Sequence, residues 1–319
     1  MKSKVFAAVV AVSVSTVSAY AADLPSKKAA IAPPAPVSVN GFDFAWGGKL
    51  MSDYISRGVS QSGGYPSATA YGEARYNIGD TQLYAGIQGW AVKLPTSPSA
   101  EIDLYGGVRQ TIGKFTVDLG GIYYWYPGNT NQYWINGLTV VNTQVRPGPL
   151  FTATTAKDPS FLELYAKPSF NITDSFNVGA NVYWSPNWNN YGFNSTYVSA
   201  TAKYTFGESG FSVSGEFGRQ YLGTTKATSI YGQFAFPSYN SWNAGISYAY
   251  KVFTVDARYY GSSLSKAQCY AVGSDPKGNV NGIVSGVSNW CGNRFMVSLS
   301  ADMTLKDLSG PASAVVAKY

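Results

Sequence analysis

Apolar and polar residues alternate one by one along most of the chain, and the helical period of 3.6 is not found. The clearest examples are 115–126 and 293–305, where every second residue is apolar or aromatic. A period of two indicates a β-strand, because successive side chains point to opposite faces. These stretches exceed the roughly 5–6 residues of a typical soluble strand. They match the roughly 9–11 residues that a strand needs to cross a membrane.

The same pattern recurs along the chain and predicts about twelve strands, within a range of 10–14. The predicted strands are 42–58, 67–78, 81–92, 100–112, 114–126, 160–171, 175–185, 195–206, 210–221, 240–250, 252–262 and 293–305. Pro168 lies in the sixth strand, where it removes a ladder hydrogen bond, so this strand is expected to be shorter or bulged.

Tight turns join these strands in pairs, and longer connections separate the pairs. The turns are 77–80, 113–114, 171–174, 207–210 and 250–252, and the connections are 60–66, 94–100, 127–160, 185–192, 222–240 and 262–292. Short turns at one end and long loops at the other are typical of outer-membrane barrels, with the short turns in the periplasm. The expected fold class is therefore all-β, a transmembrane antiparallel up-and-down β-barrel with both chain ends in the periplasm.

Aromatic residues gather at both ends of the predicted strands, as in the girdles of membrane barrels. Beside the short turns are Tyr76, Phe115, Phe170, Phe176, Phe206, Phe211, Tyr250 and Phe253. Toward the long loops are Trp90, Tyr123, Trp125, Trp184, Trp242 and Tyr259. On single strands the two groups are separated by roughly 20–25 Å, close to the height of an apolar band.

The N-terminus has the features of an export signal. Lys2 and Lys4 precede an apolar stretch, and Ala19-Tyr20-Ala21 is a suitable cleavage site. We expect a cleaved signal peptide at 1–21, a Pro/Ala-rich periplasmic tether at 22–40 and the barrel at 41–305. Residues 306–319 are either a tail or a closing segment with a further strand. The expected location is the outer membrane of a Gram-negative cell.

Cys269 and Cys291 lie in one polar, Gly-rich segment. Exported proteins meet an oxidising compartment, so we expect a disulfide between them. The rival interpretation is a metal site, but two thiolates without any His are a poor ligand set.

Only 13% of the residues are charged, which suits a barrel that faces lipid on one side. Charges on the lipid face are costly, so the charged strand residues are expected to point inward as candidates for lining a pore. These candidates are Lys49, Asp53, Glu73, Arg75, Glu101, Asp103, Arg109, Asp118, Glu163, Lys167, Lys203, Glu216, Asp256, Arg258, Arg294 and Asp302. Their near balance of acids and bases predicts either a salt-bridged plug or a polar, water-filled path of poor ion selectivity.

Catalysis is not expected. The chain has no His, which removes the usual base of outer-membrane hydrolases. Glu101 and Asp103 share a strand face and could form a carboxylate dyad, but a hydrogen-bonded acid in the lumen is commoner. We predict no catalytic residues, no metal site and no cofactor. No basic stripe of the kind that binds nucleic acid is present either.

Several motifs resemble the TorF-type porin family (the Gcw_chp domain). The similarity covers most of 45–305 and is carried by Ser52-Asp53-Tyr54, Arg57-Gly58-Val59-Ser60-Gln61, Leu83-Tyr84-Ala85-Gly86, Glu101-Ile102-Asp103-Leu104-Tyr105, Asp118 through Gly128, and Glu163-Leu164-Tyr165. The resemblance implies an outer-membrane barrel assigned as a porin.

Two functional hypotheses follow. The first is a porin-like channel for passive diffusion of small hydrophilic solutes or ions through a narrow charged lumen, with the connection 127–160 folded in as a constriction. The alternative is a structural or surface-interaction barrel with a closed lumen. The expected partners are outer-membrane lipid, lipopolysaccharide, the barrel-assembly machinery and small polar solutes, and a monomer is expected rather than a trimer.

Overall fold

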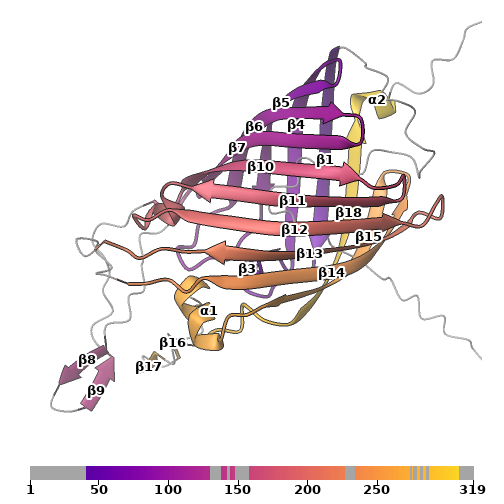
Figure 1. The fold of residues 1–319 in the computed structure, drawn as a ribbon. Coiled ribbons are helices and arrows are strands. Elements are labelled where there is room, and N and C mark those ends of the chain that lie inside the picture. Colours follow the sequence, from indigo (N-terminus) through magenta and orange to yellow (C-terminus); the bar gives the residue numbers. More distant parts are fainter. Residues whose placement is uncertain are drawn as a thin grey trace, which may run out of the picture.

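Twelve long antiparallel strands close into one barrel (Figure 1). The computed structural model describes residues 41–129, 138–141, 144–147, 158–226, 234–273, 275, 279–280, 283–284 and 287–308. The barrel strands are β1 (Gly41–Met51), β4 (Ser67–Ile78), β5 (Thr81–Trp90), β6 (Glu101–Ile112), β7 (Phe115–Trp125), β10 (Phe161–Asn171), β11 (Phe176–Ser185), β12 (Ser195–Thr205), β13 (Phe211–Tyr221), β14 (Tyr239–Tyr250), β15 (Phe253–Ser262) and β18 (Arg294–Thr304). The predicted fold class is confirmed.

The remaining elements lie in the connections between barrel strands, except for α2, which follows the last of these strands. Three two-stranded sheets are formed by β2 (Ile55–Ser56) with β3 (Val59–Ser60), β8 (Leu138–Val141) with β9 (Gln144–Pro147), and β16 (Asn279–Val280) with β17 (Ile283–Val284). The helices are η1 (Trp188–Asn190), α1 (Lys266–Gly273) and α2 (Leu305–Leu308). Among the described residues no helix has the length and apolar character to cross a membrane.

The two ends of the barrel differ as the sequence predicts. Tight turns such as 79–80 and 113–114 join strands at one end, called here the short-turn end. The opposite, long-loop end carries the connections that include η1 and α1, and Figure 1 shows α1 at that end with α2 at the other.

Side chains alternate strictly between the two faces of the barrel wall. On β5, Leu83 and Ile87 are exposed on the outside, whereas Tyr84 and Gln88 are buried inside. The apolar side of this strand therefore points outward, as expected for a wall that faces lipid. Trp90 is an exception among the predicted girdle residues: its side chain is only 2% exposed and points inward, because it shares a face with Tyr84.

The predicted first strand, 42–58, was wrong at its end. The other eleven predicted strands agree with the structure to within two residues at each end, but β1 stops at Met51. Ser52 still donates its N–H to Val297 O of β18 at 2.8 Å, and the chain then leaves the wall. Arg57 and Gly58 have φ of 46° and 78°, so the chain reverses there into the β2–β3 hairpin instead of continuing as a strand.

Pro168 neither shortens nor bulges β10. The register of β10 with β11 is the same on both sides of the proline, from Ala166↔Val182 to Ser169↔Gly179, and only the two positions between lack ladder partners. The barrel closes through β18, which pairs with β15 on one side and β1 on the other and ends at Thr304. Residues 1–40 and 309–319, which include the predicted signal peptide and tether, lie outside the described residues.

Inward tyrosines lie flat against the wall because glycines stand next to them. A Cβ added to Gly86 would lie 2.4 Å from the Tyr105 ring, and one added to Gly120 would lie 2.6 Å from the Tyr165 ring. Gly218 receives the Tyr197 ring in the same way. Glycine is required at these places because any side chain would occupy the position of the ring.

Candidate functional site: the barrel lumen and its mouth

Residues 52–66, called here the inner hairpin, fold into the barrel at the long-loop end. Ile55 and Val59 are 1% and 4% exposed, so the hairpin is packed within the molecule. Asp53 anchors the start of the inner hairpin. The Asp53 Oδ1 accepts from Ser60 Oγ at 2.6 Å, and the Asp53 Oδ2 pairs with Arg294 of β18 at 2.7 Å. The hairpin is also tied to the β15–β18 connection, since Val59 forms an isolated bridge with Cys291.

Arg57 at the tip of the inner hairpin reaches the opposite wall. Its guanidinium forms a bidentate ion pair with Glu163 of β10, at 2.8 and 2.6 Å. The same group donates to Gln220 of β13 at 3.1 Å, and it lies over the rings of Tyr183 and Tyr197 on β11 and β12. In the strand order, β10 to β13 stand across the barrel from β1 and β4, which carry the hairpin. The hairpin therefore crosses the lumen.

Two further carboxylates, of Glu101 and Asp103 on β6, lie beside the hairpin. Glu101 accepts hydrogen bonds from the hydroxyls of Tyr54, at 2.7 Å, and Tyr126, at 2.8 Å. Asp103 accepts from Trp90 Nε1 at 2.9 Å. Burial, followed by the negative charge of Glu101, raises the pKa of Tyr54 and of Tyr126 well above the usual value, so both hydroxyls stay protonated donors. Within the described ranges neither carboxylate forms an ion pair.

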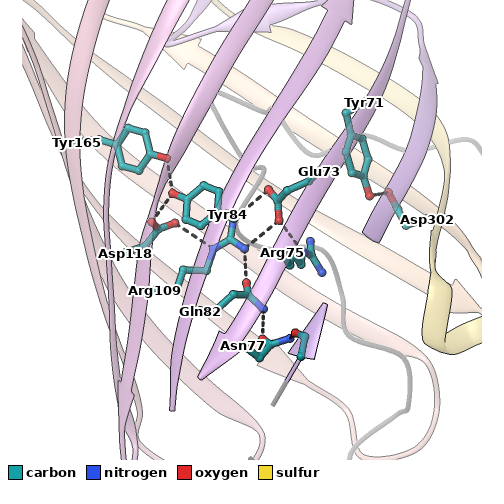
Figure 2. A network of polar contacts seen from close by, with 11 residues as sticks. Tyr71, Glu73, Arg75, Asn77, Gln82, Tyr84, Arg109, Asp118, Tyr165 and Asp302 are labelled. Carbon is teal, nitrogen blue, oxygen red and sulfur yellow. Dashed lines mark hydrogen bonds and ion pairs between the residues drawn. The ribbon is translucent and has the colours of Figure 1, made fainter. Parts of the chain in front are cut away.

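Nearer the short-turn end, a second network joins β4, β5, β6, β7 and β10 (Figure 2). Glu73, which is 0% exposed, pairs with Arg109 at 2.9 Å and also with Arg75. Asp118 pairs with Arg109 at 3.4 Å and with Lys167 at 3.2 Å. The network therefore has three bases for two acids. Around the inner hairpin the described balance is reversed, with Arg57 and Arg294 against Asp53, Glu101, Asp103 and Glu163. Buried, fully paired groups of this kind fix the geometry of the wall.

Tyrosine and amide side chains extend this second network. The Tyr84 hydroxyl donates to Asp118 at 2.5 Å and contacts the Tyr165 hydroxyl, as Figure 2 shows. Gln82 accepts from Arg109 at 2.6 Å and donates to Asn77 at 2.8 Å. Polar side chains therefore continue along the lumen wall from the ion pairs toward the short turns.

The remaining predicted lumen residues lie on β1, β12, β13, β15 and β18, the part of the wall outside this network. Arg258 pairs with Asp256 at 2.7 Å and donates to Asn243 at 2.6 Å. Glu216 accepts from Asn243 at 3.2 Å, and Asp302 accepts from the Tyr71 hydroxyl at 3.0 Å. Lys49 shares the inward face of β1 and is half-buried, and Lys203 shares the inward face of β12 and is exposed. All the predicted residues thus face inward, except Asp53, which belongs to the inner hairpin.

Above the inner hairpin, the long-loop end encloses a chamber of about 820 Å³. Its floor includes Arg57, Glu101, Glu163 and Gln220, and η1 and α1 contribute to its sides. The chamber is rich in aromatic side chains: Tyr54, Tyr124, Tyr126, Phe161, Trp188, Tyr191, Phe234, Phe236, Tyr239, Tyr270 and Trp290.

The predicted disulfide is present and borders this chamber. Cys269 of α1 bonds to Cys291, with the two Cα atoms 5.8 Å apart. Cys291 bridges Val59, and Trp290 O accepts from the N–H of Ser60 at 2.8 Å. The cross-link therefore ties α1 to the inner hairpin.

Sequence reasoning missed the two groups that shape the lumen most. Arg57 was assigned to the first strand. The glycine at position 58, within a polar stretch, is a turn signal that could have marked an earlier end of that strand. The inward tyrosines were missed because tyrosine suits either face of a barrel wall. The hypothesis that 127–160 constricts the pore falls mostly outside the described residues, whereas the inner hairpin does occupy the lumen.

Comparison with known families supports the motif resemblance. A family model described as "Bacterial protein of unknown function (Gcw_chp)" matches residues 36–155. The motifs at Glu101 and Asp118 fall within the match, and the motif at Glu163 falls beyond it. No curated protein matches the chain.

Solved structures with a similar course of the chain include an outer membrane channel and two porins. The COG4313 outer membrane channel from Pseudomonas putida F1 is 10% identical, with 88% of this chain and 99% of that chain covered and a TM-score of 0.47. The KdgM porin is 8% identical, with 81% and 98% covered and a TM-score of 0.43. The NanC porin is 10% identical, with 82% and 99% covered and a TM-score of 0.41. At these scores the likeness carries no argument about this chain's substrate.

Proposed function

We propose that this protein is an outer-membrane channel for small hydrophilic solutes or ions, held closed at its cell-surface end by the inner hairpin. The short-turn end would face the periplasm, as in other barrels of this type. One observation carries the proposal: the hairpin crosses the lumen and is latched to the far wall through Arg57 and Glu163.

The distribution of exposure along the lumen supports a plug at one end. At the hairpin level Glu163 and Gln220 are each 1% exposed. Toward the short-turn end Lys203 is exposed, and Asn77 and Asp302 are half-buried although they face inward. Inward residues close to the short turns are therefore covered less uniformly than those at the hairpin, although Asp256, at 2% exposed, is buried there as well.

Current through single molecules in planar bilayers tests the proposal. Side-chain exposures of 9% for Arg57 and 1% for Glu163 make this a buried ion pair. Removing one partner of such a pair costs about 3 kcal/mol, which is equivalent to roughly a 100-fold change in an equilibrium. Wild type should be closed most of the time, and Arg57→Ala should show stepwise openings far more often.

Arg219→Ala is the matched control. Arg219 is an arginine at the same end of the barrel, but it faces outward and donates to Asn240 at 2.9 Å, away from the hairpin. It should conduct like wild type. Equal, continuous conductance in all three proteins would show that the hairpin is not the constriction.

The closed, surface-interacting barrel is the second candidate, and the packing of the lumen at the hairpin level favours it. This candidate predicts no ion conductance from Arg57→Ala, and none from a chain in which a short Gly-Ser turn replaces the inner hairpin. Folding of the silent variants would be verified by their heat-dependent shift on gels.

A further inference from the structure

We propose that the chamber above the inner hairpin binds a small organic cation, an ammonium or guanidinium group carried on an apolar body. The inference rests on the proposed function only for the side of the membrane that the chamber faces. The chamber itself is defined by its floor of charged residues and its aromatic sides.

The charge of the floor favours a cation. Arg57 is the one basic residue among the described residues that line the chamber, and Glu163 already takes its guanidinium in a bidentate pair. Glu101 has tyrosine hydroxyls as partners in place of a base. Asp103 lies on the same face of β6, outside the chamber lining, and its Oδ1 has no hydrogen-bond partner within the described part of the chain. A local excess of negative charge near low-dielectric walls attracts cations.

The aromatic lining provides the contact surface. Tyr54 and Tyr126 are themselves chamber residues, and their hydroxyls donate to Glu101, so a guest on an open ring face would lie near that carboxylate. The other face of Tyr54 is covered by Trp90, with ring centroids 4.2 Å apart. Aromatic ring faces attract cations, most strongly where water is excluded. Trp188, Tyr191 and Phe236 form a cluster at the side, with ring centroids of Tyr191 and Phe236 5.1 Å apart, that can contact the apolar part of the guest.

The protein already holds its own cations in this way. The guanidinium of Arg57 lies 4.9 and 4.7 Å from the ring centroids of Tyr183 and Tyr197. Deeper in the lumen, Arg109 lies 3.7 Å from the Tyr84 ring centroid while pairing with an acid. A tyrosine ring face next to a carboxylate that pairs with the cation is thus the recurring cation site of this lumen. The chamber offers the same combination with no cation of the described chain in place over Tyr54 and Tyr126.

Equilibrium binding to the purified full chain in detergent tests the inference without any need for conductance. The probe is benzyltrimethylammonium, compared by calorimetry with neutral benzyl alcohol and anionic benzenesulfonate, which carry the same ring. The cation should bind at least about tenfold more tightly than the alcohol, and the sulfonate should bind worst. Equal affinity for the cation and the alcohol would overturn the inference, because the chamber would then be merely apolar.

Isosteric variants locate the site. Glu101→Gln should weaken binding of the cation about fivefold to tenfold and leave the alcohol unchanged, since it removes charge but little volume. Glu208→Gln, in an exposed turn at the short-turn end, is the control and should bind like wild type. If Glu101→Gln fails to fold, Trp188→Leu should weaken both the cation and the alcohol. Unchanged affinity in the folded variants would place the binding elsewhere and refute the inference.

Binding and conductance separate the two proposals. If the protein binds the cation but the Arg57→Ala variant shows no conductance, the channel is refuted and the binding site is not. A chain that conducts but does not prefer the cation would refute the binding site alone.

Discussion

Glu73 offers a direct measure of how much the lumen network stabilises the barrel. Its carboxylate is 0% exposed and receives three donors: Arg75 Nε, and Arg109 Nη1 and Nη2 at 2.9 and 3.1 Å. In Glu73→Gln one oxygen is replaced by an NH₂ group, which faces the arginine donors and cannot accept from them. Two buried cations then lose their main partner.

The expected cost can be estimated from this geometry. Breaking a buried ion pair costs about 3–5 kcal/mol. Arg109 keeps Asp118 at 3.4 Å and Gln82 at 2.6 Å, so the lower figure applies. We expect Glu73→Gln to lower the free energy of unfolding by about 3 kcal/mol. The measurement is urea unfolding of the barrel in lipid vesicles, followed by tryptophan fluorescence.

A double-mutant cycle with Arg109→Gln checks the cause. If the loss arises from the ion pair, the double variant should lose clearly less than the sum of the single variants. Glu208→Gln, whose side chain is exposed, should unfold like wild type. The reasoning is refuted if Glu73→Gln falls within about 0.5 kcal/mol of wild type.

Two further predictions concern packing and the cross-link. Gly120→Ala should lower the free energy of unfolding by about 1–3 kcal/mol, because its Cβ would lie 2.5 Å from Gly106 O and 2.6 Å from the Tyr165 ring. Gly89→Ala, whose Cβ would meet its nearest atom at 3.4 Å, should be nearly neutral in the same urea titration, and equal losses would refute the steric explanation. Cys269→Ser with Cys291→Ser should loosen the connection that bridges Val59, so openings in planar bilayers should become more frequent. Unchanged gating in this variant, or in wild type after reduction, would show that the disulfide does not restrain the inner hairpin.

The strands were predictable because their signals are local. Alternation along β7 and a tight turn at 113–114 involve neighbours in the sequence, so no knowledge of the rest of the fold is needed. The end of β1 was not predictable in this way, since Lys49, Asp53 and Arg57 continue a row of charges on one face of the expected strand. Whether Asp53 and Arg57 stay in the wall depends on β18, some 240 residues further along the chain, where Val297 accepts the last wall contact from Ser52.

The charged lumen residues were predictable for a physical reason as well. An unpaired charge in lipid is costly, so an inward direction could be assigned to Glu73 or Asp118 without knowing their partners. Their pairing across β4, β6 and β7 could not, because it depends on strand register. The inner hairpin, which brings Arg57 to Glu163, needed the three-dimensional structure.

The tyrosines that lie against glycines also have a consequence for how the barrel is assembled. Tyr105 stands opposite Gly86, and Tyr165 stands opposite Gly120. A strand that slipped by two residues would keep every side chain on its proper face, so hydrophobicity alone could not detect the error. It would, however, place the ring of Tyr105 against Tyr84 or Gln88, the inward neighbours of Gly86. These ring-and-glycine pairs therefore disfavour a shifted strand register. They favour the correctly paired barrel over one in which only the inward and outward faces are correct.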